Sequence, residues 1–419
     1  MGSHTVKSIL IILILSTIVM QCIPKTDPAD SQKAFERGTY GYDVLFLQKN
    51  EISAIELKAP DSEARVLLSP QYQGRVMTSS ARGNEGMSFG WINYDLISSK
   101  KINPQFNPVG GEERFWLGPE GGPFSIYFPE GKKQEFENWV VPPEIDTKPF
   151  NVASQTNGTC VFTAQFNLQN ASGTHLEVGV EREVSILSRT QSAEMLGVTL
   201  DASLDIVAYQ SKNELTNRGS DKWSPEDGFL SVWLLCMFNP SEKGIVFIPY
   251  TEGSEDELGN ICNDDYFGKV PAERLIAGNG MLYFKVDGKK RSKIGLSPFR
   301  AMNLAGSYDE INQLLTILWY SKPEEELPYV NSKWGKQDNP LKGDVINSYN
   351  DGPVADGSIM GPFYEIESSS PAALLDSGES IIHTQRVFHI SGDEALLNKI
   401  TQSLFNIELE QIKQVFKNQ

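Results

Sequence analysis

Short stretches in which apolar and polar residues alternate recur along the chain from about residue 40 onward. Every second side chain is apolar in residues 161–168, and the same period in residues 176–186 is interrupted only by Arg182. Alternation with one polar face is typical of a half-buried antiparallel strand. We expect further strands, separated by turn residues, at 54–58, 64–68, 124–128, 230–238, 244–249, 281–286, 314–319 and 383–390.

The C-terminal end has helical spacing instead. Ser391 and Glu394 stand three residues apart, as in a capping box. The apolar residues after them recur on one helical face, at Leu396, Leu397, Ile400, Leu404 and Ile407. We therefore predict a helix over 393–417 that packs on the strands. No fixed repeat or strong linker interrupts the chain between 40 and 390, so residues 40–419 are predicted to form one large all-β domain with this short C-terminal α-helix.

The N-terminus carries the longest apolar run, residues 8–21. It is short for a membrane span, which needs about 20 residues. Lys7 precedes the run and Cys22 follows it, which resembles a bacterial lipoprotein export signal. We predict an export signal over 1–22, lipidation at Cys22 and a flexible tether over 23–39. The protein would then reside in the cell envelope, as an outer-membrane or periplasmic lipoprotein; a buried core helix is the alternative for residues 8–21.

The net charge of −17 over 419 residues narrows the range of partners. Nucleic acid is excluded as the main partner because phosphate binding needs clustered Lys and Arg. Electrostatic docking onto anionic lipid is disfavoured too, which leaves a lipid anchor as the only expected membrane contact. The body has three cysteines, Cys160, Cys236 and Cys262, without CxxC spacing. Neither a disulfide framework nor a zinc site can be predicted from them.

The segment 110–128, GGEERFWLGPEGGPFSIYF, is dense in polar and aromatic residues. The Arg114 fork and an exposed Trp116 indole would suit a hydroxylated, partly apolar ligand such as a sugar ring, and Glu120 follows closely. Its glycines would let the backbone approach a ligand. The alternative is an ordinary strand with glycine-rich turns and a buried Trp.

A second segment, GPFYEIESSSP at 361–371, carries two carboxylates. Strand alternation places Glu365 and Glu367 on one face, about 7 Å apart. Two carboxylates at that distance repel, so one is expected to hold its proton unusually well, which suits general acid/base catalysis. The alternative is a solvated strand face with two ordinary glutamates.

Oxygen-rich loops occur at 263–265, with Arg274 nearby, and at 344–351. They could hold Ca²⁺, but neither follows EF-hand spacing and their residues are common in turns. His383 and His389 would stand about 20 Å apart on one strand, too far for one metal site. We predict no metal or other cofactor, with Ca²⁺ left open.

Several blocks, in order, resemble the galactose-mutarotase-like superfamily, which includes the aldose 1-epimerases. They are QYQGRVM at 71–77, EREVSI at 181–186, LTNRG at 215–219 and the closing stretch 363–388. The GGEERFWLGPEGG block resembles an uncharacterised branch of secreted bacterial lipoproteins. The resemblance implies a large antiparallel β-supersandwich, with carbohydrate bound on its main sheet.

In aldose epimerases a glutamate removes the anomeric proton while a histidine protonates the ring oxygen. The resemblance places Glu367 or Glu365 as the base and Arg75 or Arg114 as the ring-binding arginine. No histidine stands at the family's position, where this chain reads ELTNRGSDKW. Glu120 or a tyrosine would then be the acid. The remaining substrate-binding candidates are the stacking residues Trp116 and Trp223, and Arg274.

The resulting hypothesis is an exported, monomeric carbohydrate-active protein, an aldose 1-epimerase-like isomerase that opens the sugar ring by acid/base catalysis. The alternative is a non-catalytic glycan-binding lipoprotein of a polysaccharide-utilisation system. A third hypothesis, a structural lipoprotein, requires Glu365 and Glu367 to lie far from the segment 110–122.

Overall fold

The computed structural model describes residues 34–354 and 356–417. The predicted export signal, Cys22 and all but the last residues of the predicted tether lie outside them. Residues 36–417 belong to one compact unit, called the second unit below, which contains every helix and strand named here. Within the described ranges, no helix has both the length and the apolar character to span a membrane.

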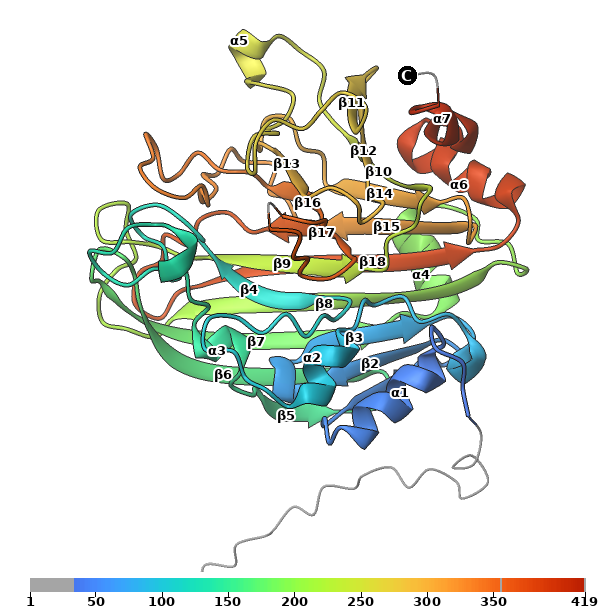
Figure 1. Ribbon diagram of the computed structural model, residues 1–419, viewed down its shortest axis with the longest axis horizontal. Coiled ribbons are helices and arrows are strands. Elements are labelled where there is room, and N and C mark those ends of the chain that lie inside the picture. Colours follow the sequence, from blue (N-terminus) through green and yellow to red (C-terminus); the bar gives the residue numbers. More distant parts are fainter. Residues whose placement is uncertain (1–33, 355, 418–419) are drawn as a thin grey trace, which may run out of the picture. The chain divides into compact units, whose positions relative to one another are not determined.

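Three antiparallel sheets form the second unit (Figure 1), which confirms the predicted all-β class. The ten-stranded sheet has the order β11 (Leu275–Gly278), β12 (Met281–Lys285), β10 (Gly244–Pro249), β14 (Leu304–Asp309), β15 (Leu314–Tyr320), β18 (Ser380–Ser391), β8 (Asp205–Asn217), β7 (His175–Ile186), β6 (Thr159–Gln169) and β5 (Asn151–Gln155). The five-stranded sheet has the order β13 (Ser292–Leu296), β16 (Ile346–Asn350), β17 (Tyr364–Ser369), β9 (Ser231–Phe238) and β4 (Arg114–Gly118). The three-stranded sheet is β1 (Ile55–Lys58), β2 (Arg65–Ser69) and β3 (Arg75–Ser80).

One face of the five-stranded sheet packs against the ten-stranded sheet. Ile366 and Cys236 lie opposite each other on β17 and β9 and belong to the largest buried apolar cluster. Gln385 of β18 bridges the two sheets, because its Nε2 donates to Cys236 Sγ at 3.1 Å and its Oε1 accepts from Ser368 Oγ at 2.7 Å. Since side chains alternate along a strand, the opposite face of β17 presents Glu365 and Glu367.

Helices cover the other apolar surfaces. Helices α4 (Arg189–Leu196), α6 (Glu394–Phe405) and α7 (Leu409–Gln414) share a buried cluster with β10, β14, β15 and β18. Phe405 of α6 meets Phe247 of β10 edge to face at 4.8 Å. Helices α1 (Tyr40–Lys49) and α2 (Tyr94–Ser99) pack with residues of β2 and β3. The short helices α3 (Pro143–Asp146) and α5 (Glu255–Leu258) lie in loops.

The predicted C-terminal helix packs on the strands, but it is two helices. Asn406 adopts a left-handed conformation with φ of 54° and ends α6. The N-cap is Asp393, whose side chain accepts from the backbone N–H groups of the first turn, whereas Ser391 closes β18. Gln411 forms a capping box with Glu408 at the start of α7, which explains why it interrupts the apolar stripe.

Two further expectations differ from the structure. Residues 124–128 are not a strand: Ser125 N–H bonds back to Gly122 in a turn, and Tyr127 N–H donates to the Ser125 hydroxyl at 3.1 Å. The Ser125 and Tyr127 N–H groups therefore bond within the turn and not to a neighbouring strand. Helix α1 was not predicted, although Thr39 caps it by accepting from Tyr42 N–H.

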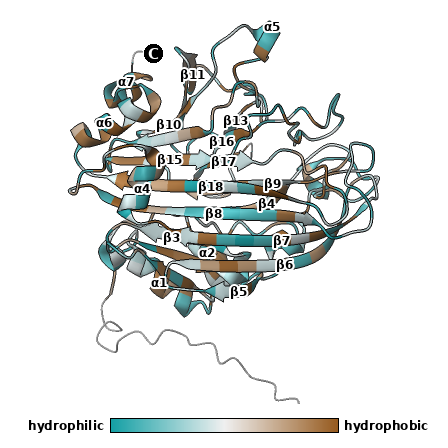
Figure 2. Cartoon of the chain, turned by 180° about the vertical axis from the view of Figure 1, so that it is seen from behind, coloured by the Kyte–Doolittle hydropathy of each residue, from teal (hydrophilic) through white to brown (hydrophobic). Residues whose placement is uncertain are grey.

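Buried polar side chains run across the middle of the ten-stranded sheet, where β7, β8 and β18 are hydrophilic (Figure 2). Arg182 of β7 donates from Nη2 to Glu113 Oε1 at 2.6 Å and from Nη1 to Asn213 Oδ1 at 2.5 Å. Its Nε donates to Gly74 O at 3.1 Å. Arg182 interrupts the apolar face of its strand because it forms this buried ion pair.

Candidate functional site

The outward face of the five-stranded sheet gathers the charged candidates. Glu367 lies opposite Asn347 of β16 on one side and Leu235 of β9 on the other, and Leu235 lies opposite Arg114 of β4. The two segments singled out in the sequence, around Arg114 and Glu367, are thus neighbours across one strand. The carboxylates lie on this sheet and not on the ten-stranded main sheet, where the resemblance placed the sugar site.

Glu367 is 1% exposed and has one oxygen fully engaged. Its Oε2 accepts from Lys293 Nζ at 2.8 Å and from Trp233 Nε1 at 2.9 Å. Its Oε1 has no hydrogen-bond partner among the described residues. Two donors on one oxygen hold the carboxylate in one orientation and leave the other oxygen able to accept a proton or a hydroxyl.

Glu365 is buried two residues away on the same face. Burial, and then the charge of Glu367, raise the pKa of Glu365 to about 8, against the opposing effect of Arg114. Arg114 Nη2 lies 3.5 Å from Glu365 Oε1. This environment lets Glu365 keep its proton at neutral pH.

Arg114 is 4% exposed and only partly satisfied. Its guanidinium lies over the Trp116 ring, 3.8 Å from the centroid, and its Nε and Nη1 lack hydrogen-bond partners within the described chain. Trp116 is itself buried, and its Nε1 donates to Ile145 O at 3.2 Å. The expectation of an exposed Trp116 indole is therefore wrong: the buried Trp116 ring packs against the Arg114 guanidinium.

A cavity of about 1160 Å³ adjoins this face, and Lys293, Trp233 and Glu120 are among its lining residues. Lys293 and Trp233 therefore contact both Glu367 and the cavity. Burial raises the pKa of Glu120, and Glu367 adds to that effect while Lys293 opposes it. Glu120 thus lies within electrostatic reach of the buried Lys293–Glu367 pair and faces the cavity.

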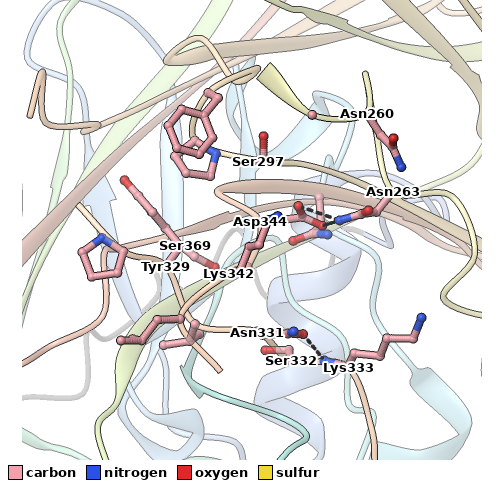
Figure 3. A pocket seen from close by; sticks show the side chains of 18 of the residues that line it. Asn260, Asn263, Ser297, Tyr329, Asn331, Ser332, Lys333, Lys342, Asp344 and Ser369 are labelled. Atoms are coloured by element: carbon pink, nitrogen blue, oxygen red, sulfur yellow. Dashed lines mark hydrogen bonds between the residues drawn. The ribbon is translucent and has the colours of Figure 1, made fainter. Parts of the chain in front are cut away.

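The cavity wall also brings together the two oxygen-rich loops (Figure 3). Asn263 Nδ2 donates to both oxygens of Asp344 at 2.9 Å, and the Tyr266 hydroxyl donates to the same carboxylate. Burial raises the pKa of Asp344. Gly295 is required beneath this group, since a Cβ there would lie 2.2 Å from Asp344 Oδ2 and 2.3 Å from Asn347 Nδ2. Among the residues that the structure describes, no three His, Cys, Asp or Glu side chains are grouped to hold a metal ion.

Three candidates lie away from the cavity. Arg75 is 1% exposed and donates to Gly110 O at 2.6 Å and to Gln73 Oε1 at 3.3 Å; burial, and then Arg114, lower its pKa to about 9. Trp223 is buried in the main apolar cluster. Arg274 pairs with Asp287 at 2.6 Å and 3.1 Å. These contacts give Arg75, Trp223 and Arg274 structural roles, and none of the three is among the residues that line the cavity; their assignment to substrate binding stays a prediction.

The glycines of segment 110–122 approach other parts of the protein rather than a cavity ligand. Gly110 has a φ of 87°, and a Cβ there would lie 2.2 Å from Trp91 O. A Cβ on Gly121 would lie 2.4 Å from Lys333 O. These positions need glycine for close backbone packing; the approach of this backbone to a ligand stays a prediction.

Sequence analysis missed Lys293, Trp233 and Tyr266. The one local signal is in β13, where SKIGL alternates so that Lys293 falls on the face opposite Ile294 and Leu296. Trp233 is hidden in a strand that is apolar on both faces.

Solved structures with a similar fold come from several bacteria. A protein proposed to be an aldose 1-epimerase from Escherichia coli K12 has a TM-score of 0.46 at 10% identity, covering 80% of this chain and 99% of its own. A galactose mutarotase-like protein from Lactobacillus casei has a TM-score of 0.43 at 10% identity, with 80% and 100% covered. A galactose mutarotase related enzyme from Lactobacillus acidophilus has a TM-score of 0.42 at 10% identity, with 80% and 97% covered.

A comparison with curated proteins finds no match. The model of one protein family matches residues 38–416, which is nearly the whole chain. The chain therefore belongs to the family of unknown function DUF6786.

Proposed function

We propose that this protein binds carbohydrate in the cavity beside the five-stranded sheet and catalyses an acid/base reaction of the aldose 1-epimerase type. The observation that supports the proposal best is the state of Glu367. Lys293 and Trp233 hold its Oε2, while its Oε1 lacks a hydrogen-bond partner in the described residues. A carboxylate held in one orientation beside a cation, with one oxygen free to accept, has the geometry that a general base requires.

In this reaction Glu367 takes the proton of the anomeric hydroxyl as the C1–O5 bond breaks. Glu120 gives its proton to the ring oxygen O5, which becomes a hydroxyl, while C1 becomes a carbonyl. Rotation of the C1–C2 bond and reversal of both proton transfers return the other anomer, so no atoms or electrons are lost. Burial raises the pKa of Glu120, which favours the protonated form that this role needs.

Arg114 and Glu365 act as positioning residues. Arg114 lies 3.5 Å from Glu365 and places a positive charge within electrostatic reach of Glu367. The pKa of Glu365 is raised to about 8, so this side chain stays neutral at pH 7. A neutral Glu365 does not repel the neighbouring Glu367 carboxylate.

A second candidate function is non-catalytic glycan binding in the same cavity. The burial of Glu367, at 1% exposed, favours it, because a sugar hydroxyl must displace neighbouring side chains to reach Oε1. In that case the carboxylates of Glu120 and Asp344 accept hydrogen bonds, and both line the cavity.

Proton NMR of freshly dissolved sugars tests the two functions together. The panel contains hexoses, pentoses and uronic acids, with wild-type protein, Glu367→Gln, Glu120→Gln and Glu194→Gln as a control on the exposed surface of α4. Accelerated anomer equilibration that is lost in Glu367→Gln and Glu120→Gln and kept in Glu194→Gln is the expected result. Line broadening of sugar signals without faster anomer equilibration would contradict catalysis and support non-catalytic glycan binding. If no sugar shows either accelerated equilibration or line broadening, both functions are overturned.

We propose further that the protein is exported and anchored through lipid at Cys22. The support is the run of apolar residues 8–21 between Lys7 and Cys22. Labelling of bacterial cells with radioactive palmitate should mark the wild-type protein and fail to mark Cys22→Ala; equal labelling of both would contradict the anchor.

A further inference from the structure

Exposed aromatic side chains are concentrated at the cavity. Among the described residues, the exposed aromatic side chains are Phe136, Phe267 and Phe299, at 61%, 48% and 43%. All three line the cavity. Large aromatic side chains left in water at one place mark a binding surface, because their burial by a ligand is favourable.

Two of these rings are held in place by neighbours. The Arg291 guanidinium lies 3.9 Å from the centroid of the Phe267 ring, and Tyr349 meets the same ring edge to face at 5.9 Å. Phe136 stacks on Trp139 at 6.2 Å, with 15° between the planes. A fixed aromatic ring loses little conformational freedom when a flat apolar sugar face stacks on it.

The cavity is larger than one sugar needs. Sites for single small molecules measure about 300–1,000 Å³, and this cavity measures about 1160 Å³. It reaches from Glu120 and Trp233 to α5 and to Phe299 in the loop after β13. Glu120, the proposed acid, makes up only a small part of this lining, so the remaining volume is available for additional units of the same ligand.

The charge of the lining decides which ligand fits. Nine acidic and five basic side chains line the cavity. Two runs of three acidic residues, 255–257 and 324–326, are exposed along it. A chain of uronic acids would meet repulsion there, whereas a neutral glycan would not.

We infer that the ligand is a neutral oligosaccharide of several sugar units, whose outer units stack on Phe136, Phe267 and Phe299. This inference rests on the proposed carbohydrate function and adds the class of ligand. A chain of sugars spans the cavity, its end unit beside Glu120 and its remaining units along the three phenylalanines.

Calorimetric titration of the purified protein tests the inference. The probes are glucose, galactose, mannose and xylose, the linear homo-oligomers of each up to six units, and oligogalacturonides of the same lengths. We expect at least one neutral series to bind tenfold or more tightly at four units than at one. Phe267→Ala and Phe299→Ala should remove most of that gain. Met302→Ala is the matched control, since Met302 is 49% exposed and is not among the lining residues.

Each contrary result has its own meaning. Single sugars that bind with no gain from added units would overturn the inference and leave the proposed function standing. Tightest binding of oligogalacturonides would overturn the inference through its charge argument. A length-dependent gain that survives both phenylalanine variants would overturn the role of the aromatic residues. Binding of no probe at all would contradict the proposed function itself.

Discussion

Two buried glutamates of this protein, Glu113 and Glu367, are paired with cations in very different ways. Glu113 is fully buried and bonded on both oxygens, by Arg182 at 2.6 Å and by Gln385 at 2.6 Å. Glu367 is almost as buried, but Lys293 and Trp233 bond only one of its oxygens. Lys293 also reaches the cavity, whereas Arg182 is 0% exposed.

The difference separates an ion pair that stabilises the fold from one that can take part in binding or catalysis. A buried charge whose every atom is bonded gains its stability from geometry and has nothing left to offer a ligand. A buried charge with an unused oxygen beside a cavity costs free energy in the empty protein, and such groups are found mainly where a ligand or proton is handled. We therefore expect substitution of Glu113 to lower the stability of the fold and substitution of Glu367 to lower the rate of the proposed reaction.

The largest effect is expected from Arg182→Met. The substitution leaves Glu113 buried without its cation, and breaking a buried pair in this way costs roughly 3–5 kcal/mol. Urea denaturation followed by circular dichroism measures the loss of unfolding free energy. A loss below about 1 kcal/mol would contradict the structural role of the pair.

The pH dependence of stability tests the protonation of Glu365, beside Glu367. The folded protein binds a proton at Glu365 up to a pKa of about 8, above the usual value of 4.5, so the native state holds more protons than the unfolded state between these values. Stability therefore falls as pH rises through this window, with a limiting slope of about 1.4 kcal/mol per pH unit from this one group. Denaturation at pH 5, 6, 7 and 8 should show a smaller decline in Glu365→Gln. Identical slopes in both proteins would contradict the protonated state of Glu365.

Lys293→Met tests how the cation supports the proposed base. Without the ammonium at 2.8 Å, protonation of the cluster becomes easier. We expect the acidic limb of the kcat/KM profile to move to higher pH by about one unit, with an activity loss that approaches about tenfold toward the acidic end of that limb. Lys293→Arg should restore part of the wild-type profile. An unchanged limb with lower activity at every pH would point to a purely steric role.

The smallest effect is expected at an exposed ion pair. Lys243 and Glu310 lie 3.0 Å apart, with the Lys243 side chain 51% exposed. Lys243→Ala should change the unfolding free energy by less than about 1 kcal/mol, because solvent and salt screen such a pair. A larger loss would mean that proximity alone, and not burial, sets the importance of charge pairs in this protein.

Local pattern predicted the strands well and the site only in part. Alternation placed the strands around Phe162 and Val178 and put Glu365 and Glu367 on one face, because side-chain direction in a strand depends only on neighbouring residues. It also misread residues 124–128, where side-chain hydrogen bonds satisfy the backbone. The C-terminal helix was found but not its break at Asn406, since a single left-handed residue leaves little trace in the apolar period.

The partners of Glu367 could not be predicted in the same way. Lys293 lies 74 residues and Trp233 134 residues from Glu367 in the sequence. Their meeting depends on the pairing order β13-β16-β17-β9-β4, in which strands distant in sequence become neighbours. The buried partners of Arg75 and Arg274 escaped prediction for the same reason: the carbonyl of Gly110 and the carboxylate of Asp287, which accept from them, are not visible in local sequence.

The most direct test of the account compares Glu113→Gln with Glu367→Gln for both stability and anomer equilibration. We predict that Glu113→Gln loses roughly 3–5 kcal/mol of unfolding free energy and that its folded fraction keeps wild-type activity. Glu367→Gln should change stability by at most about 1 kcal/mol, since Lys293 reaches the cavity and its ammonium can be solvated there, unlike that of the fully buried Arg182, and should lose about 10²- to 10⁴-fold in rate. Equal losses of stability in the two variants, with no selective loss of rate in Glu367→Gln, would contradict the distinction between the ion pair that stabilises the fold and the one that can take part in binding or catalysis.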